Sequence, residues 1–410
     1  MKIGILTNTY PPNLNGVSIA VQNLENALRK KGVEVFIATP KVKGVEYPDN
    51  VLPLKSIRTK NKVSPDLAIP YDYIDDVVKF FKKNQVELVH THDIFIGAAE
   101  GIVVSTKLSV PSVHTFHTFV ESYPYLQVPA RKEIIRQHIR LVCNNYSHIT
   151  APSQKVYKYL AQVGFETPVT QLLNVPNGDY LKPKSKDHSL AKQLGIKKDD
   201  FVFVTFCRVA EEKTVDIGLV VLHQLLKKYN NIKYLISGQG PEIEELQNLA
   251  KHLGVQDKVI FSGKYTPQDL SSIGSISDVF IFTSHTENLP TNIFEALSLG
   301  LPIISVDDES VDYLLNTGYN GYKGSVDEMT EYAEQIYLDK GLKKQISDNA
   351  LLSVKELINK DIVTDYIALY QRLIKYYKQE PQTDSEIKNT FDQLFRIPKI
   401  VRRTLKKLLD

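Results

Sequence analysis

The sequence contains few of the residues that mark several classes of protein. It has no tryptophan and only two cysteines in 410 residues, Cys143 and Cys207, which lie far apart and in apolar surroundings. This pattern argues against a disulfide framework and predicts reduced core cysteines, as in a cytoplasmic protein. No apolar run is long enough to span a bilayer. Residues 2–7 form too short an apolar run for a signal peptide and predict a strand instead.

An excess of charge of one sign is also missing, since the net charge is +3. With 42% hydrophobic and 24% charged residues, the composition is that of a soluble globular protein. There is no short-period repeat and no low-complexity segment. A chain of 410 residues is too long for one ordinary core, so we expect two domains.

What is present is an alternation of strand and helix patterns. In the first half these patterns fall at residues 2–7, 17–31, 33–38, 86–90, 95–107, 112–115 and 148–151. The polar stretch 177–200 is interpreted as a linker with a short helical piece, and the alternation restarts at 201 and continues to 315. The pattern predicts an α/β fold of two doubly wound domains. A cleft between two such domains would be a common place for a ligand site.

The last hundred residues are predicted to be helical. Helical periodicity covers residues 325–339, 342–359 and 362–378, and a break at 379–384 separates a further candidate helix at 386–409.

Two glutamates, Glu287 and Glu295, lie eight positions apart in His-Thr-Glu-Asn-Leu-Pro-Thr-Asn-Ile-Phe-Glu. A strand pattern at 278–283 precedes Glu287, and Glu295 lies in the first turn of an apolar helix at 293–299. Both therefore lie near the carboxyl end of a strand, where ligands bind in open α/β sheets. Two carboxylates there suit a polyhydroxylated ligand. Asn292 followed by Glu295 also fits a helix capping pattern, and a solvated loop carboxylate is the alternative for Glu287.

Gly16 and a pair of cations occupy similar positions. Gly16 lies between the first strand and the first helix, where a glycine lets backbone approach a phosphate, although Asn-Gly also marks a tight turn. The motif is not GxGxxG, so a dinucleotide is not indicated. Arg208 and Lys213 follow the first strand of the second half and suit a diphosphate. The alternative is a helix-start pair neutralised by Glu211 and Glu212.

Histidines follow two predicted strands, in His90-Thr-His-Asp93 and His114-Thr-Phe-His117-Thr. A metal site is one interpretation, but neither a helix-spaced pair nor a cysteine partner supports it. Two alternatives stay open. The histidines either face a cleft and orient a sugar hydroxyl, or are partly buried and satisfied.

Together these motifs resemble those of the retaining, nucleotide-sugar-dependent glycosyltransferases of family 4, which have the two-Rossmann GT-B fold. The resemblance covers roughly residues 1–378. The motifs that carry it are Tyr-Pro-Pro-x-x-Asn-Gly-Val at 10–17, Thr-Phe-His-Thr at 115–118, Ala-Pro-Ser at 151–153, Pro-Asn-Gly-Asp at 176–179, Arg-x₄-Lys at 208–213, Ser-Gly-Gln-Gly-Pro-Glu at 237–242, and Glu-x₇-Glu followed by Ala-Leu-Ser-Leu-Gly-Leu-Pro at 287–302.

The resemblance implies a hexosyltransferase with an acceptor domain at 1–177 and a donor domain at 178–358. A helix at 359–379 would cross back to the first domain, and 385–410 would form a tail. Arg208 and Lys213 would hold the donor diphosphate, and no metal or other cofactor would be needed in the chemistry. The remaining expected roles are Gly16 beside the diphosphate, Glu295 on the ribose, Glu287 on the donor sugar near the reacting carbon, and His117 near the sugar 6-position.

One departure from the family pattern lies in the loop between the glutamates. Glycine is common there, whereas this chain has Pro290, which has no N–H to donate. The amides of Leu289 and Thr291 are then the expected phosphate ligands.

The tail is strongly basic. Residues 396–407 contain six cations and no acid, with apolar residues at three- and four-residue steps and Pro398 as a kink. This predicts an amphipathic helix on an anionic membrane surface, while packing on a domain or partner is the alternative. The stretch 119–136 is a second candidate for a lipid-facing rim, and a core-packed helix with a solvated face is the equal alternative.

Within the family, these features are most similar to bacterial diacylglycerol glucosyltransferases. We therefore expect transfer of a hexose, glucose by preference, from a UDP-sugar to a membrane lipid such as diacylglycerol. The enzyme would lie in the cytoplasm, peripherally on the inner face of the cell membrane, and bind no nucleic acid. Two alternatives stay open: a same-fold enzyme with a polysaccharide, protein or soluble acceptor, and a non-catalytic sugar-nucleotide-binding partner protein.

Overall fold

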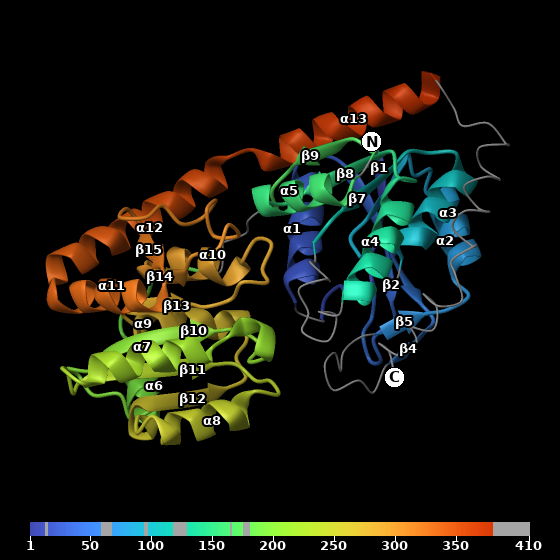
Figure 1. Cartoon of the computed structure of the whole chain (residues 1–410). Coiled ribbons are helices and arrows are strands. Elements are labelled where there is room, and N and C mark those ends of the chain that lie inside the picture. The colour runs from blue at the N-terminus through green and yellow to red at the C-terminus, as the bar shows by residue number, and fades with distance from the viewer. Residues whose placement is uncertain are drawn as a thin grey trace. The chain divides into compact units, whose positions relative to one another are not determined.

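The computed structural model describes residues 1–12, 15–58, 68–93, 97–117, 129–164, 166–174 and 181–379. The chain divides into two compact units, which are described separately (Figure 1). Unit 1 comprises Met1–Val175 and Asp361–Asp410, and unit 2 comprises Pro176–Lys360. Among the described residues, no helix is both long enough and apolar enough to cross a membrane.

Unit 1 is built on a parallel sheet of seven strands in the order β3-β2-β1-β6-β7-β8-β9. Its strands are β1 (Lys2–Leu6), β2 (Glu34–Pro40), β3 (Val51–Leu54), β6 (Leu88–Thr91), β7 (Ser112–Thr115), β8 (His148–Ala151) and β9 (Val169–Gln171). A separate antiparallel pair is formed by β4 (Ser56–Arg58) and β5 (Ala68–Pro70). The order reverses between β1 and β6, which is the switch point of a doubly wound sheet.

Helices cover both faces of this sheet, because alternate strand residues point to opposite sides. Ile3 and Ile5 of β1 pack with α1 (Gly16–Lys30) and α13 (Ile362–Gln379). Leu6 packs with α2 (Ile74–Lys83) and α3 (Ala98–Leu108) on the other side. Further along the sheet, β8 packs with α4 (Pro129–Cys143) and α5 (Gln154–Val163).

Unit 2 repeats this plan with six parallel strands in the order β12-β11-β10-β13-β14-β15. Its strands are β10 (Phe201–Phe206), β11 (Ile232–Ser237), β12 (Val259–Gly263), β13 (Val279–Phe282), β14 (Ile303–Val306) and β15 (Gly321–Gly324). The switch point lies between β10 and β13.

Two apolar cores lie on the two faces of the unit 2 sheet. One contains α7 (Asp216–Leu226), α8 (Ile243–His252) and α11 (Val326–Leu338), and the other contains α6 (His188–Gln193), α9 (Leu270–Ser275), α10 (Thr291–Ser298) and α12 (Lys340–Asn359). Short 3₁₀ helices occur at Glu211–Lys213, Gln256–Lys258 and Pro267–Asp269.

Most predicted elements occur within a few residues of their expected bounds, and the predicted fold of two Rossmann-like domains is confirmed. The elements that were not predicted are β3, β4, β5, β9, β15 and α2, whereas α4 agrees with a core-packed helix, the alternative for residues 119–136. β3 and β9 are edge strands of four and three residues, too short for an alternating pattern to be recognised. Residues 311–315 form neither helix nor strand, and the last strand is β15 instead.

Part of the predicted linker belongs to the core of unit 2. Ala191 of α6 and Ile196 are buried against the core formed with α9 and α10. Both cysteines are free, as expected of reduced core residues. Burial raises the pKa of the Cys207 thiol to about 12.

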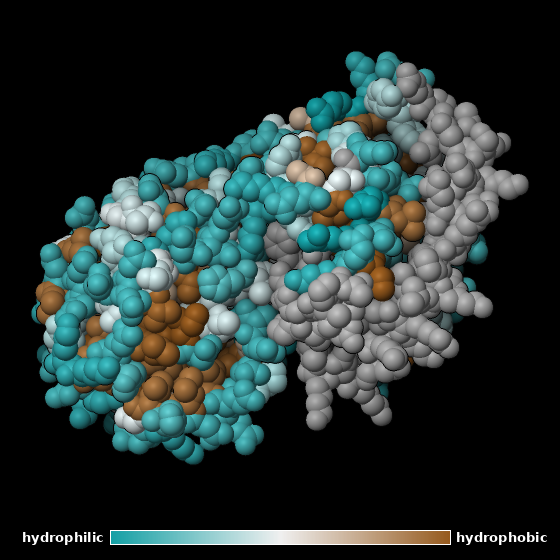
Figure 2. All heavy atoms as spheres, viewed as in Figure 1, coloured by the Kyte–Doolittle hydropathy of each residue, from teal (hydrophilic) through white to brown (hydrophobic). Residues whose placement is uncertain are grey.

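The described surface in the view of Figure 2 is mostly hydrophilic, with hydrophobic residues gathered in a smaller area of unit 2.

Candidate functional site

The predicted donor residues of unit 2 meet at the switch point of its sheet. β10 and β13 pair in parallel, with Phe203 beside Val279 and Val204 beside Phe280. The chain leaves β10 toward β11 and leaves β13 toward β14, in opposite directions along the sheet. The segments that carry Arg208, Lys213 and Glu287 thus start from neighbouring carboxyl ends, where open α/β sheets bind ligands.

Hydroxyl groups join these two segments. Thr283 Oγ1 donates to the Lys213 carbonyl at 2.8 Å, and Thr214 Oγ1 donates to the Thr283 carbonyl at 2.5 Å. Ser284 and Thr286 both donate to the Glu212 carbonyl, at 3.1 and 3.2 Å. These hydrogen bonds therefore fix the segment after β10 relative to the segment after β13.

Lys213 and Glu287 form an ion pair across these segments, with Lys213 Nζ donating to Glu287 Oε1. Both side chains are mostly buried, at 21% and 25% exposed. Burial lowers the pKa of Lys213, but the charge and hydrogen bond of Glu287 outweigh it, so the net shift is upward. Lys213 is therefore a fixed cation at neutral pH.

Arg208 is more exposed and forms an ion pair with Glu212, one helical turn further along the chain. The alternative in which neighbouring glutamates neutralise both cations therefore holds for Arg208, whereas Lys213 pairs with Glu287 instead. The guanidinium is 42% exposed, so solvent screens this pair and Arg208 can exchange partners at small cost.

The loop after β13 leads into α10, which begins at Thr291. The predicted capping pattern is wrong, because Pro290 is the N-cap and no side chain caps the helix. Asn292 is the second helical residue, and its amide donates to the Phe206 carbonyl at 3.4 Å. Pro290 therefore removes an N–H only at the cap, and the first N–H groups of the helix start at Thr291.

Leu289 contributes packing as well as backbone, because its partly buried side chain lies against the core that contains α10. Leu289 and Thr291 thus flank Pro290 at the positive end of α10, which is a suitable position for an anion.

Glu295 lies inside α10 and is only 8% exposed. Burial raises the pKa of its carboxyl to about 8. No hydrogen bond to this carboxyl is formed by residues that the structure describes. A buried carboxyl without such bonds is costly unless a ligand supplies hydroxyl groups.

The Ser-Gly-Gln-Gly motif at 237–240 supports the Arg208 segment through backbone contacts. A Cβ on Gly238 would lie 1.9 Å from the Cys207 carbonyl oxygen, and one on Gly240 would lie 1.8 Å from the Val209 carbonyl oxygen. Val209 N–H donates to the Gln239 carbonyl at 3.0 Å. Steric contact with the backbone therefore explains why glycine occupies positions 238 and 240, and the sequence alone did not give this explanation.

In unit 1, Gly16 is the first residue of α1, and Asn15 is the N-cap. Asn15 accepts from Ser18 N–H at 2.9 Å and completes a capping box. A Cβ on Gly16 would meet nothing within 4 Å. Gly16 therefore lies at an open helix N-terminus, as an anion would require, and the tight-turn interpretation is replaced by a helix cap.

His117 follows β7 and pairs with His92, which follows β6. His92 Nδ1 and His117 Nε2 are 2.9 Å apart, and the two rings stack with centroids 5.2 Å apart. Burial lowers the pKa of His117 to about 4 and that of His92 well below its ordinary value. Both imidazoles are therefore neutral at pH 7.

His90 fits the alternative of a satisfied buried histidine, whereas His114 is bonded through one ring nitrogen only. His90 contacts Tyr370 Oη at 2.8 Å and Thr115 Oγ1 at 2.7 Å, and His114 Nδ1 contacts Thr91 Oγ1 at 2.8 Å. Within the part of the chain that the structure describes, no three His, Cys, Asp or Glu side chains come together as a metal site would require.

Sequence reasoning missed the role of Asp93. Its carboxylate accepts from Asn8 N–H at 2.6 Å and from Thr7 Oγ1 at 3.2 Å, which ties β6 to β1 at the switch point of unit 1. Burial raises the pKa of this carboxyl to about 6. The signal available in the sequence was the position of Asp93 shortly after a predicted strand.

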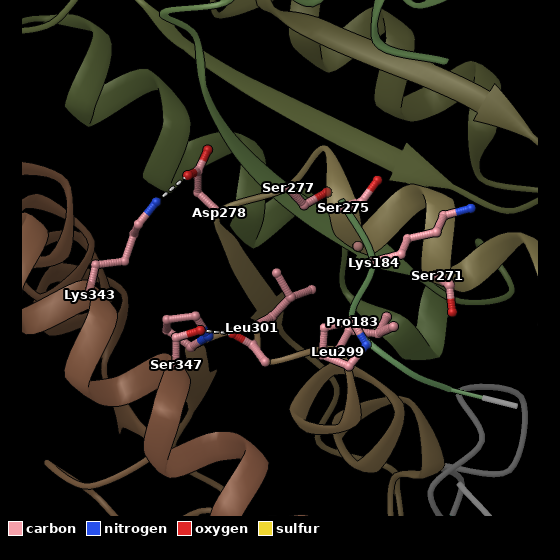
Figure 3. Close-up of a pocket in the computed structure, with 13 residues that line it drawn as sticks. Pro183, Lys184, Ser271, Ser275, Ser277, Asp278, Leu299, Leu301, Lys343 and Ser347 are labelled. Carbon is pink, nitrogen blue, oxygen red and sulfur yellow. Dashed lines mark hydrogen bonds and ion pairs between the residues drawn. The ribbon is translucent and has the colours of Figure 1, made fainter. Parts of the chain in front are cut away.

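A cavity of about 200 Å³ lies elsewhere in unit 2 (Figure 3). It is lined by residues that precede β13 and β14, so it lies at the amino ends of the strands. Lys343 Nζ bonds to Asp278 there at 2.5 Å, and Lys184 Nζ bonds to Ser272 at 2.5 Å. This cavity is separate from the Lys213 site.

Two family profiles match the chain. Residues 14–178 match "Glycosyltransferase Family 4" and residues 187–352 match "Glycosyl transferases group 1". The chain therefore belongs to the family 4 glycosyltransferases of the GT-B fold, enzymes that transfer a sugar from a sugar nucleotide.

Similar proteins fall in the same class. An alpha-monoglucosyldiacylglycerol synthase of Acholeplasma laidlawii is 27% identical over 91% of this chain and 98% of its own. The protein of that name in Streptococcus pneumoniae is 26% identical over 77% of this chain and 73% of its own. In structure, the HepE protein of Anabaena, solved in complex with UDP and glucose, matches with a TM-score of 0.73. It is 18% identical over 91% of this chain and 99% of its own.

Proposed function

We propose that this enzyme transfers glucose from UDP-glucose to a membrane lipid such as diacylglycerol, with retention at the sugar carbon. The observation that carries the donor half is the Lys213–Glu287 pair at the β10–β13 switch point. The names of two similar proteins, the alpha-monoglucosyldiacylglycerol synthases of Acholeplasma laidlawii and Streptococcus pneumoniae, support the acceptor half.

The donor would occupy the carboxyl edge of the unit 2 sheet. Lys213 and Arg208 would bind the diphosphate, aided by the N–H groups at the start of α10. Glu295, buried and without a hydrogen bond from described residues, would accept from the ribose hydroxyls. Glu287 would contact the sugar hydroxyls beside the reacting carbon. In unit 1, Gly16 would lie beside the diphosphate, and His117 would lie near the sugar 6-position.

The reaction breaks the bond between the sugar C1 and the β-phosphate oxygen. The acceptor hydroxyl oxygen bonds to C1 on the face that the phosphate leaves, and its proton passes to the departing phosphate oxygen. Negative charge grows on the β-phosphate during this step. Lys213 stabilises that charge more in the transition state than in the ground state, and this difference lowers the barrier.

The lipid half of the proposal also draws on the basic segment 385–410, which lies outside the described residues. Its cations and apolar steps suit an anionic membrane surface. The stretch 119–136, only partly within the described residues, is the second candidate for contact with lipid. Peripheral binding at the inner face of the cell membrane belongs to the same proposal.

The test is a radiolabelled transfer assay that crosses UDP- and GDP-sugars with diacylglycerol vesicles and soluble acceptors. We expect label from UDP-glucose in the lipid fraction, with the α linkage intact. We also expect full activity after EDTA treatment, because Lys213 and Arg208 take the place of a metal. Transfer only to a soluble acceptor would reject the lipid assignment, and loss of activity in EDTA would reject metal-independent chemistry.

A further inference from the structure

The contact between His92 and His117 raises a question about which nitrogen donates. With both rings neutral, each ring carries one proton. Across the 2.9 Å contact, either His92 Nδ1–H donates to His117 Nε2, or His117 Nε2–H donates to His92 Nδ1. The two arrangements give His117 opposite properties toward a ligand.

The surroundings of His92 distinguish the two arrangements. His92 is 3% exposed, and its second nitrogen, Nε2, is buried with no hydrogen-bond partner among the described residues. If His117 were the donor, the proton of His92 would sit on Nε2 and a buried N–H would be orphaned. Buried N–H groups are rarely left unpaired, whereas unpaired acceptor atoms are more common. The first arrangement is therefore favoured.

Neighbouring residues hold the ring of His92 in place. Its ring lies 4.2 Å from the ring of His90, and His90 is held by Tyr370 and Thr115. The next residue along the chain, Asp93, accepts a hydrogen bond from the backbone N–H of Asn8. A ring fixed in this way can set both the orientation and the tautomer of the histidine that it contacts.

The geometry points to His92 as a positioning residue that donates from Nδ1 to His117 Nε2 and so holds the ring proton of His117 on Nδ1. His117 is then neutral and carries its ring proton on Nδ1, which fixes the form of the ring that the donor site would meet. That a sugar nucleotide meets this ring rests on the proposed function, but the tautomer does not.

The decisive measurement is a long-range ¹H–¹⁵N correlation spectrum of the full-length protein labelled at histidine. We expect the His117 and His92 nitrogens to show protonated Nδ1 and unprotonated Nε2. A spectrum with His117 protonated at Nε2 would overturn the inference. This result is independent of whether any acceptor has been found.

Variants then test the positioning role. An asparagine side-chain amide can place an N–H close to the position of Nδ1, whereas phenylalanine keeps the ring and removes the donor. We expect His92→Phe to lower kcat about tenfold, and His92→Asn to stay within about threefold of the wild type. The spectrum of His117 should change in the first variant only. Equal kcat in both variants and an unchanged His117 signal would reject a positioning role.

His114→Phe is the matched control. His114 is also buried and neutral, bonds through Nδ1 and has an unpartnered Nε2 among the described residues, but its hydrogen-bond partner is Thr91. We expect it to lower stability and leave the His117 signal unchanged; a shifted His117 signal would show that any buried histidine has this effect. If His117→Ala leaves wild-type turnover intact, the proposed role of His117 fails, while the spectrum still decides the tautomer.

Discussion

Lys213 and Glu287 are separated by 74 positions in the sequence and joined by one ion pair in the fold. In the absence of a donor, Glu287 supplies the negative charge that Lys213 needs in a mostly buried place. A diphosphate would supply the same charge, so binding would replace one anionic partner by another and leave Glu287 for the sugar hydroxyls.

Replacement of Lys213 tests this at the scale of one residue. We expect Lys213→Ala to reduce kcat about a hundredfold, or by roughly 3 kcal/mol of transition-state stabilisation. Glu287→Ala should also reduce turnover. Both are measured by initial rates of sugar transfer. The matched control is Lys343→Ala, which breaks a comparable pair with Asp278 at the opposite ends of the strands. Activity unchanged in Lys213→Ala would contradict the donor site.

Glu295 gives a prediction about pH and stability. Its folded pKa of about 8 lies above the ordinary value of 4.5, so the folded state retains a proton that the unfolded state releases between these pH values. The free energy of unfolding therefore falls as pH rises through this window. We expect Glu295→Gln to raise the free energy of unfolding at pH 8 by roughly 1–4 kcal/mol, with a smaller gain at pH 5.

Urea unfolding of the wild type and Glu295→Gln at pH 5 and pH 8 measures this difference in the free energy of unfolding. The same variant should bind UDP-glucose more weakly, since Glu295 is the expected ribose ligand. A stability difference that is the same at both pH values would show that ionisation of the buried Glu295 carboxyl does not cause it.

At the scale of elements, the segment between β10 and α7 is held by close backbone contact with the Ser-Gly-Gln-Gly motif. Gly240→Ala would place a methyl group against the Val209 backbone, and neither side can withdraw as a flexible side chain would. We expect a loss of stability of about 1–3 kcal/mol and reduced transfer, because the segment carries Arg208 and Lys213.

Calorimetry and transfer rates check this prediction. Gly341→Ala is the control, since Gly341 lies in the first turn of α12 and its nearest neighbour is the side chain of Asp339, 3.2 Å from the added Cβ. That change should be neutral or slightly stabilising in a helix. An equally neutral result for Gly240→Ala would mean that the backbone contact is not needed.

At the scale of the whole molecule, the prediction concerns the basic tail. Deletion of residues 385–410 should weaken binding to anionic vesicles while hydrolysis of the donor survives, because every candidate donor residue lies outside the deleted segment. Each cation near an anionic leaflet contributes about 1 kcal/mol, and salt should weaken the binding. Sedimentation with vesicles measures the effect, and unchanged sedimentation would reject a membrane role for the tail.

Sequence patterns located the candidate residues but few of their partners. The positions of Gly16, Arg208, Lys213 and Glu287 after strands could be read from local order. The pairing of Arg208 with Glu212 corresponds to the alternative in which neighbouring glutamates neutralise the cations. The capping pattern at Glu295 failed because Pro290 sets the start of α10, and burial of this carboxyl depends on the packing of α10 with residues distant in sequence.

The sequence by itself determined the alternation of strands and helices, the two α/β units and the chemistry at the strand ends, because these depend on periodicity and on neighbours along the chain. Only the tertiary structure decided that β10 lies beside β13, that Lys213 meets Glu287 and that His92 meets His117. Strand order and side-chain packing bring together residues far apart in sequence, and no local pattern records which strands become neighbours.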